Sequence, residues 1–341
     1  MELLVHPLRL ELDQPFTIAH GTFQHRDAVV VELRQDGFSG FGEATAISYY
    51  GKSQQRFVEA LEAFRPTLSS RQLDHPANLY QHLQTQLADP FLRCALDVAA
   101  HDWWAKKSGL PLDQALGLTR TTAIRSNYTI SIGPIETMQE SVRKHPHPVY
   151  KVKLGTEDDL AIIRALRAVT TAIFRVDANA AWSVEKTLRL APQLRDLGVE
   201  FIEQPLPADD WKGAAKLFQK SPLPIIADES CQTAQDVTRC YRHFHGVNVK
   251  LMKCGGITSA IPMLRRARFL KMRTMVGCMT ETSIGISAIA HLLPLLDYVD
   301  MDGALLLKKD PATGVQLKNG RVIFQDKNGH GGELRRVESI I

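Results

Sequence analysis

Eight short runs rich in β-branched and apolar residues recur at a steady interval along the second half of the chain and alternate with helix-like stretches. The runs are 126–133, 149–155, 173–179, 199–205, 224–230, 246–253, 273–279 and 297–303. Strands that alternate with helices pair in parallel, because each crossover returns the chain to the same edge of the sheet. Eight repeats over about 180 residues favour a closed β/α barrel over an open sheet.

The segments on either side of these repeats have a different pattern. Residues 29–33 and 38–44 alternate as strands around Asp36-Gly37, which is a hairpin signal, and helical periodicity extends from about 53 to 108. A second hairpin is predicted over 314–324 and is expected to return to the first domain. We therefore expect an α+β domain at 1–120, the barrel at 121–303 and a tail at 304–341.

Composition excludes several classes of function. The 41 basic and 37 acidic residues are well mixed, so the net charge of +4 gives no warrant for nucleic-acid binding. The best candidate for a membrane span, 285–299, is interrupted by His291, Pro294 and Asp297. The five cysteines form no CxxC pair, and the first residues do not resemble a signal peptide. We expect a cytoplasmic protein with neither nucleic-acid nor membrane partners.

Ionisable residues stand at the carboxyl ends of the predicted strands. They are spaced about one repeat apart: 24 residues separate Lys153 from Asp177, and the next intervals are 26, 25 and 22. The set comprises Lys151, Lys153, Asp177, Glu203, Asp228, Lys250, Asp300 and Asp302. Because the strands of a barrel end at one face, these side chains are expected to converge there. Lys151 and Lys153 can both point inward, about 7 Å apart.

Three carboxylates on adjacent strands require a cation to neutralise them. Oxygen ligands favour a hard divalent ion, most often Mg²⁺, which can bind a substrate carboxylate and stabilise a developing enediolate. No His or Cys lies at a strand end in a zinc-like pattern, and Cys278 stands alone.

Lysines beside such an ion are suited to acid–base catalysis. An ammonium near Mg²⁺ and another lysine is expected to have a lowered pKa. Lys153 and Lys250 belong to the second and sixth strands, on opposite sides of the barrel, so one base could serve each face of a carbanion. Taken singly, each acid could instead cap a helix and each lysine could be solvated, but the order and spacing of the whole set favour a joint site.

The motifs KVKLG, VDANAAW, IEQP, ADES and VNVKLMKCGG resemble the barrel motifs of the enolase superfamily, muconate lactonizing enzyme subgroup. The segments at 40–44 (GFGEA) and 95–117 resemble the same family, so the resemblance covers nearly the whole chain. It implies a (β/α)7β modified TIM barrel with an N-terminal α+β capping domain that the C-terminal tail completes. It also implies one Mg²⁺ per subunit on Asp177, Glu203 and Asp228. Lys153 and Lys250 would be the acid/base pair, with Lys151 in support.

The eighth strand distinguishes the reactions within that subgroup. Asp300-Met301-Asp302 resembles the DxD motif of dipeptide epimerases, and 277–285 resembles their seventh loop, which would place Met279 and Thr280 against the peptide backbone. Two carboxylates at i and i+2 can hold a substrate ammonium while the metal holds the substrate carboxylate. The alternative for Asp300 is a helix cap or a salt bridge.

Two loops of the first domain, near 19–26 and 46–52, are expected to set substrate preference. L-Ala-D/L-Glu epimerases of this family carry an arginine in the first of these loops, whereas residues 19–23 here have the sequence Ala-His-Gly-Thr-Phe. Arg26 lies further on and is interpreted as a surface residue. Gly21, Tyr49 and Tyr50 are the candidate substrate contacts, although loop packing would also explain the tyrosines. A side-chain carboxylate would then lack a cation, which favours small or apolar dipeptides over strictly L-Ala-D/L-Glu.

The sequence therefore predicts an Mg²⁺-dependent isomerase that inverts the Cα of the C-terminal residue of a dipeptide. The alternatives are an o-succinylbenzoate synthase, an N-acylamino acid racemase or a muconate cycloisomerase of the same subgroup, or a catalytically silent metal-binding barrel. A homo-oligomer is compatible with the sequence, and a contribution of Asn179 to the metal site is left open.

Overall fold

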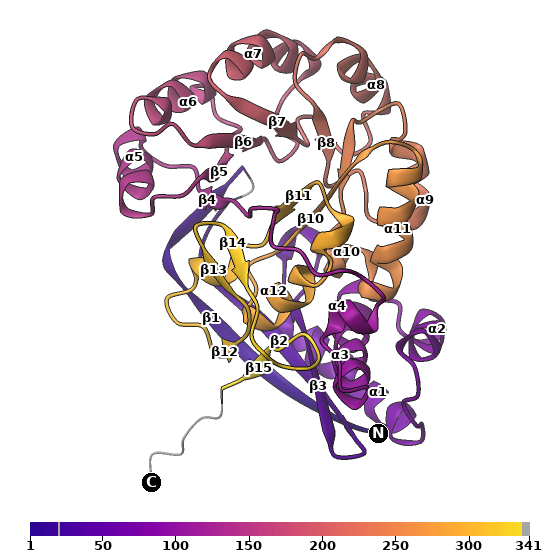
Figure 1. Cartoon of the computed structure of the whole chain (residues 1–341). Helices are drawn as coiled ribbons and strands as arrows, with labels where there is room; N and C mark the ends of the chain where they lie inside the picture. Colours follow the sequence, from indigo (N-terminus) through magenta and orange to yellow (C-terminus); the bar gives the residue numbers. More distant parts are fainter. Residues whose placement is uncertain (20, 336–341) are drawn as a thin grey trace.

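The computed structural model describes residues 1–19 and 21–335 and contains the predicted barrel (Figure 1). Within these residues, eight parallel strands form one sheet in the order β11-β10-β9-β8-β7-β6-β5-β4. A parallel bridge between Ser126, just before β4, and Val299 of β11 joins the two edges of this sheet. The sheet is therefore closed, as the repeat pattern predicts.

Each barrel strand lies within one of the runs identified in the sequence. The strands are β4 (Tyr128–Ile130), β5 (Val149–Lys153), β6 (Ile173–Asp177), β7 (Val199–Glu203), β8 (Ile225–Ala227), β9 (Gly246–Asn248), β10 (Arg273–Gly277) and β11 (Tyr298–Asp300). They are shorter than the sequence runs, because the last residues of each run leave the ladder and turn toward the loops.

Helices follow the first seven strands and cover the outside of the barrel (Figure 1). They are α5 (Ile135–Lys144), α6 (Asp159–Arg167), α7 (Val184–Asp196), α8 (Trp211–Lys220), α9 (Ala234–Cys240), α10 (Leu251–Cys254) with α11 (Ile257–Phe269), and α12 (Ser283–Ala290). The 3-10 turn η2 (Leu293–Leu295) precedes β11, and in the described chain another, η3 (Gly303–Leu306), follows it in place of an α-helix. The architecture is thus (β/α)7β.

Helix α7 illustrates how the sequence selects these elements. The Ser183 hydroxyl caps the helix by accepting a hydrogen bond from the Lys186 amide. Its buried residues, Thr187, Leu190, Ala191 and Leu194, recur at helical spacing and form a single face. That face packs on the barrel, and the polar remainder faces solvent.

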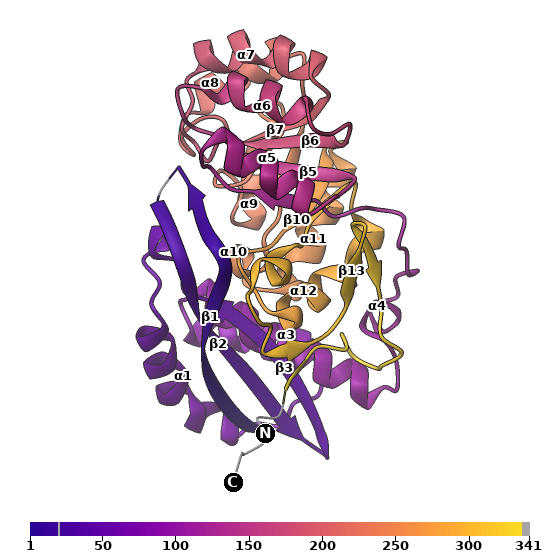
Figure 2. The same ribbon diagram turned by 90° about the vertical axis from the view of Figure 1, so that its left-hand side faces the viewer.

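An antiparallel sheet and four helices form the capping domain, which lies against one side of the barrel (Figure 2). The sheet consists of β1 (Glu2–Ile18), β2 (Gly21–Gln35) and β3 (Phe38–Thr45). The helices are α1 (Gln54–Ser69), α2 (Pro76–Gln86), α3 (Pro90–Lys107) and α4 (Leu112–Ala115), and the 3-10 turn η1 (Ser48–Tyr50) follows β3. Asp36 and Gly37 both have positive φ, 54° and 79°, which confirms the predicted hairpin turn.

The glycines of GFGEA allow β3 to lie directly on α3. A Cβ atom at Gly40 would lie 2.0 Å from the carbonyl oxygen of Ala99, and one at Gly42 would lie 1.9 Å from that of Ala95. Any larger residue at these positions would push the helix away from the sheet. This close packing fixes the end of β3, from which Glu43 and Thr45 reach toward the barrel.

The C-terminal tail contacts both domains. The predicted hairpin forms from β13 (Gln316–Lys318) and β14 (Arg321–Ile323), and β12 (Ala312–Thr313) pairs with β15 (Glu333–Leu334). The His330 amide donates to the Asp102 carboxylate at 2.8 Å, which ties the tail to α3 of the capping domain. The domain boundaries at residues 120 and 303 stay a prediction.

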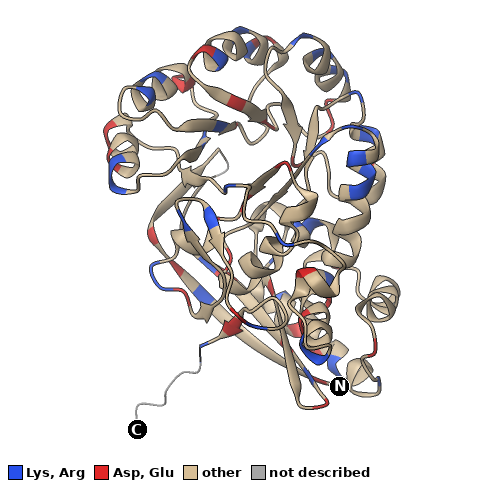
Figure 3. Ribbon diagram, viewed as in Figure 1, with Lys and Arg blue, Asp and Glu red and all other residues tan. Residues whose placement is uncertain are grey.

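Acidic and basic residues both occur on α5, α6, α7 and α9, whereas α8 and α11 carry only basic ones (Figure 3). Among the described residues, no helix is both long enough and apolar enough to cross a membrane.

Candidate active site

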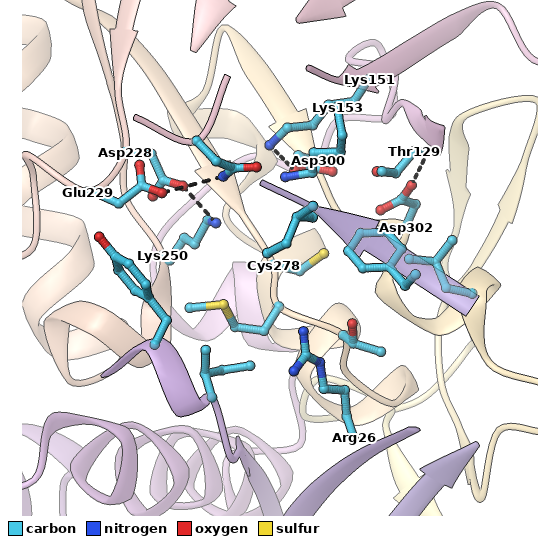
Figure 4. Close-up of a pocket in the computed structure, with 18 of the residues that line it drawn as sticks. Arg26, Thr129, Lys151, Lys153, Asp228, Glu229, Lys250, Cys278, Asp300 and Asp302 are labelled. Atoms are coloured by element: carbon cyan, nitrogen blue, oxygen red, sulfur yellow. Dashed lines mark hydrogen bonds and ion pairs between the residues drawn. The ribbon is translucent and has the colours of Figure 1, made fainter. Parts of the chain in front are cut away.

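A cavity lies between the carboxyl ends of the barrel strands and the capping domain (Figure 4). The space within it, counting the mouth that opens to solvent, is about 740 Å³. Strand ends of the barrel supply most of its charged side chains, and the capping domain supplies Arg26 and most of the apolar ones.

Three of the predicted residues form a carboxylate cluster at the bottom of the barrel mouth. Asp177 ends β6, Glu203 ends β7 directly beside it, and Asp228 follows β8. One oxygen from each lies within 4.8 Å of the others, and all three side chains are buried. The one-repeat spacing in the sequence thus brings the three carboxylates together.

The donor set of this cluster fits a hard divalent cation. Its ligands are all carboxylate oxygens, which Mg²⁺ prefers. Glu203 Oε2 is buried and accepts no hydrogen bond from the described residues, although Lys151 Nζ lies 2.9 Å away. Burial would raise the pKa of Asp177, but Lys151 and Lys153 hold it well below its ordinary value, so this ligand is ionised. Asp177, Glu203 and Asp228 could therefore hold one Mg²⁺.

Lys151 and Lys153 both point into the cavity from β5. Lys151 Nζ lies 3.0 Å from Asp177 Oδ2 and 2.9 Å from Asp300 Oδ2, while Lys153 Nζ donates to Asp177 Oδ2 at 2.7 Å. Lys151 therefore contacts the carboxylate cluster and the eighth strand at once. Lys153 is the more accessible of the two ammonium groups.

Lys250 approaches the cavity from the other side (Figure 4). It follows β9, which is four strands away from β5 in either direction around the closed ring. Its Nζ lies 2.9 Å from Asp228 Oδ2. Burial would lower the pKa of Lys250, but Asp228 and Glu203 hold it well above its ordinary value. The lowered pKa was predicted for a lysine beside bound Mg²⁺, and for that state it stays a prediction.

Asp300 and Asp302 enter the same cavity from the end of β11. Asp300 accepts hydrogen bonds from Asn127 at 2.7 Å and from Lys151 at 2.9 Å, whereas Asp302 accepts one from the Thr129 amide at 2.5 Å. Burial, followed by the charge of Asp300, raises the pKa of Asp302 to about 7. Asp300 is thus neutralised within the protein, and Asp302 is the carboxylate that lacks a cationic partner among the described residues.

Cys278 does not stand alone. Its sulfur lies within 4.8 Å of carboxylate oxygens of Asp300 and Asp302, which corrects the sequence interpretation. Burial raises the pKa of the thiol well above its ordinary value, so Cys278 contributes an uncharged wall beside the two aspartates.

The predicted substrate contacts from the loops are only partly brought together. Tyr49 and Tyr50 of η1 line the cavity, with Tyr49 half-exposed at its mouth, and Met279 and Thr280 line it from the loop after β10. Gly21, at the start of β2, lies outside the lining. His20, in the same predicted loop, lies outside the described residues.

Arg26 is not a surface residue, and this corrects the sequence interpretation. It is 8% exposed and lines the cavity on the side of the capping domain (Figure 4). Its guanidinium lies 3.4 Å from the centre of the Phe23 ring. Burial lowers the pKa of Arg26 to about 10, so the group stays charged at neutral pH. Its Nε has no hydrogen-bond partner in the described part of the chain. Its position, two residues before the buried Ala28 on the same face of β2, was the available signal.

Two further charged residues at the site were missed. Glu229, next to Asp228, lines the cavity 3.4 Å from Asn179 Nδ2, and burial followed by the charges of Asp228 and Asp177 raises its pKa to about 8. Lys253 Nζ donates to the carboxylate and, at 2.5 Å, to the carbonyl oxygen of Asp228. Both residues lie inside the ADES and VNVKLMKCGG motifs, so their place next to the cluster was readable.

A closed (β/α)7β barrel with three carboxylates and facing lysines under a capping domain defines an enzyme of the enolase type. Family models match both parts of the chain: the mandelate racemase/muconate lactonizing enzyme N-terminal domain over 1–117 and the enolase C-terminal domain-like family over 135–338. The chain belongs to the mandelate racemase/muconate lactonizing enzyme family of the enolase superfamily.

Several proteins similar to this chain are dipeptide epimerases. An L-Ala-D/L-amino acid epimerase of a Maribacter species is 45% identical over 98% of this chain and 100% of its own length. The L-Ala-D/L-Glu epimerase of Bacillus subtilis, solved in a substrate-liganded complex, is 30% identical with a TM-score of 0.92, covering 97% of this chain and 98% of its own. A dipeptide epimerase of Enterococcus faecalis, solved with Mg and L-Leu-L-Tyr, is 29% identical with a TM-score of 0.90 over the same shares.

Proposed function

We propose that this protein is an Mg²⁺-dependent dipeptide epimerase that inverts the Cα of the C-terminal residue. The observation that carries the proposal is the pair Lys153 and Lys250, which enter one cavity from opposite sides of a three-carboxylate cluster. Epimerization requires a proton to leave one face of a carbon and another to arrive at the opposite face. Two bases on opposite walls meet that requirement.

Asp177, Glu203 and Asp228 would hold the ion. Bound there, Mg²⁺ would supply the positive charge that stabilises the two oxygens of an enediolate. Lys151 Nζ lies within 3.0 Å of two of the three carboxylates, so this ammonium also favours negative charge on a substrate carboxylate at the cluster. Lys151 is too enclosed by carboxylates to release its proton, which suits a supporting role.

Lys153 and Lys250 would exchange protons with Cα. In one direction the Lys153 amine removes the proton and the Lys250 ammonium delivers one to the other face, and in the reverse direction the roles are exchanged. Each lysine has a carboxylate partner within 2.9 Å that holds the ammonium in place, Asp177 for Lys153 and Asp228 for Lys250.

Asp302 and Asp300 would bind the substrate ammonium. Asp302 is the better placed of the two, because Asp300 already contacts Lys151. A carboxylate group at one end of the cavity and a carboxylate-binding cluster at the other match a dipeptide zwitterion. Substrates that have no ammonium would leave Asp302 buried without a cation.

The side chain of the C-terminal residue would meet a wall formed by the capping domain. Phe16, Ile18 and Ile47 make this wall apolar, and Arg26 adds one cation. Apolar side chains gain about 25 cal/mol for each Å² buried there. Because Arg26 lines the cavity, the inference that a side-chain carboxylate finds no cation is wrong. The proposal is therefore an Ala-Xaa epimerase of broad range, not one restricted to L-Ala-D/L-Glu.

A library of dipeptides and N-acylamino acids incubated with the enzyme and Mg²⁺ in D₂O tests the proposal. Each epimerized dipeptide gains one mass unit at Cα and yields a second diastereomer. Ala-Xaa members with apolar and acidic side chains should exchange. Exchange only in N-acylamino acids would assign a racemase of the same family, and no exchange in any member would contradict the proposal.

We further propose that the enzyme works in the cytoplasm as a homo-oligomer. All five cysteines are free and buried, which fits a reducing compartment. Subcellular fractionation and size-exclusion chromatography test the two statements separately.

A further inference from the structure

Two buried carboxylates of the capping domain cap the amino ends of two consecutive barrel helices. Glu43 of β3 accepts hydrogen bonds from the Thr282 amide at 3.0 Å and the Thr282 hydroxyl at 2.6 Å, at the start of α12. Asp97 of α3 accepts the corresponding pair from Thr258, at 2.9 and 2.6 Å, at the start of α11. The two contacts are alike in chemistry and burial, but they differ in what lies next to them.

The loop before α12 lines the cavity, whereas no residue of α11 does. Met279 and Thr280 form part of the cavity wall, three and two residues before Thr282. Glu43 therefore holds one end of a segment whose other face is exposed to substrate.

Thr45 holds the same segment at a second point. It lies two residues after Glu43 on the same face of β3, is fully buried, and its hydroxyl donates to the Thr280 carbonyl oxygen at 2.9 Å. Residues 280 and 282 are thus both fixed to one strand of the capping domain. The closely packed glycines of β3 keep that strand at a constant distance from α3.

The contacts of Glu43 with Thr282 and of Thr45 with Thr280 together form a clamp on the loop. Glu281 lies between these two points. Its Oε1 accepts a hydrogen bond from the Met279 amide at 2.7 Å, and a Cβ atom at Gly285 would lie 2.0 Å from its Oε2. The Gly285 amide also donates to Glu43 Oε2 at 3.4 Å. The carboxyl groups of Glu43 and Glu281 therefore converge on the first turn of α12.

We propose that Glu43 and Thr45 are positioning residues for the substrate: they hold the loop 279–282 so that its backbone and the side chains of Met279 and Thr280 meet the dipeptide. This inference rests on the proposed function. It gives the capping domain a second role besides forming the apolar wall, because the same domain sets the geometry of a barrel loop.

The charge state of the clamp is consistent with a fixed loop. Burial raises the pKa of Glu43 to about 7 and that of Glu281 to about 8. The other titratable groups facing the pair include Cys94, Lys250, Cys278, Asp300 and Asp310. When two carboxyl groups converge in a buried site, one of them tends to keep its proton. The two groups then do not repel each other at the start of α12.

Steady-state kinetics of three variants test the inference. Thr45→Val keeps the shape of the side chain and loses the hydrogen bond to Thr280. Glu43→Gln places an amide donor where three donors already point at the carboxylate. Each should raise KM for a good Ala-Xaa dipeptide about three- to tenfold while kcat falls less than about twofold, and Thr45→Ser should restore KM.

Asp97→Asn is the matched control, because it weakens an equally buried helix cap whose helix does not line the cavity. It should lower the melting temperature about as much as Glu43→Gln and leave KM unchanged. An equal rise of KM in Asp97→Asn, or unchanged KM in both Glu43→Gln and Thr45→Val, would overturn the inference, since the contacts would then serve stability alone.

Hydrogen–deuterium exchange keeps this test separate from that of the activity. Compared with the wild-type protein, Glu43→Gln should increase exchange of the amides of residues 279–285, whichever substrate the enzyme acts on. If the enzyme epimerizes no dipeptide but Glu43→Gln still exchanges these amides faster, the proposed function is contradicted and the clamp is supported. Unchanged exchange there would overturn the clamp itself.

Discussion

Lys151 Nζ lies 2.9 Å from Asp300 Oδ2 and 2.9 Å from Glu203 Oε2, so one buried ammonium joins the carboxylate cluster to the eighth strand. The candidate metal site and the candidate ammonium site are therefore parts of one charge network. Removing any member should affect both halves of a bound zwitterion.

We predict that Lys151→Met destabilises the metal-free protein by about 3–5 kcal/mol, because it leaves three buried carboxylates without their shared cation. Mg²⁺ should restore more stability to this variant than to the wild type, since the ion replaces the lost charge. Denaturant unfolding with and without Mg²⁺ measures both effects. Lys186→Met, which breaks a partly buried pair with Asp159 away from the cavity, should lose stability that Mg²⁺ does not restore.

Glu203→Gln removes a charge from the carboxylate cluster itself. It should therefore weaken Mg²⁺ binding by more than the about 10- to 100-fold loss that follows substitution of a residue that only supports a metal ligand. Isothermal titration with Mg²⁺ gives the affinity, and epimerization should be lost in parallel. Glu200→Gln on the same strand, where Glu200 pairs with Arg175, should bind Mg²⁺ normally. Full turnover of Glu203→Gln in excess chelator would refute the metal assignment.

Arg26→Met should lower kcat/KM for Ala-Glu on the order of tenfold or more while changing Ala-Ala less than about threefold, because only the acidic side chain pairs with the guanidinium. Arg34→Met, on the same strand but paired with Glu32 on the outside, serves as the control. Equal losses for both dipeptides would show that Arg26 supports the fold of the wall and does not select a side chain.

The pH dependence should contain a contribution from Asp302. Because its pKa is raised to about 7, the carboxylate is ionised only above that pH, and kcat/KM for free dipeptides should rise through this range. Asp302→Asn should lose most of kcat/KM and this rise, yet affect N-acylamino acids much less.

The contribution of Asp302 to folding stability changes with pH in the opposite direction to kcat/KM. The folded protein binds the Asp302 proton more tightly than the unfolded chain, so this group stabilises the fold below its ordinary pKa of 3.8, and that contribution is lost as the pH rises to about 7. Asp302→Asn should therefore lose less unfolding free energy than the wild type between about pH 4 and pH 7. A parallel loss in both proteins would contradict the raised pKa.

The barrel and the charged half of the site could be predicted from the sequence, because both follow from local periodicity. Lys153, Asp177, Glu203 and Asp228 recur once per β/α repeat, and every repeat ends at the same face. Arg26 could not be placed in the same way, because its position depends on how far the long β1–β2 hairpin reaches over the barrel.

Contacts between the domains were likewise beyond local patterns. Glu43 and Thr282 are 239 residues apart, and nothing near either residue indicates the other. The pKa of Lys250 cannot be derived from local sequence for a related reason: it depends on whether the charge of Asp228 is balanced by an ion, which is a property of the assembled site.

The central claim is that Lys153 and Lys250 serve opposite faces of Cα, and stereospecific exchange in D₂O tests it most directly. The two diastereomers of one good Ala-Xaa dipeptide are each incubated with Lys153→Arg and with Lys250→Arg, and deuterium at Cα is followed by mass spectrometry. We expect each variant to lose epimerization and to exchange the proton of only one diastereomer, a different one for each variant. Exchange of the same diastereomer by both variants, or normal epimerization by either, would contradict the two-base account.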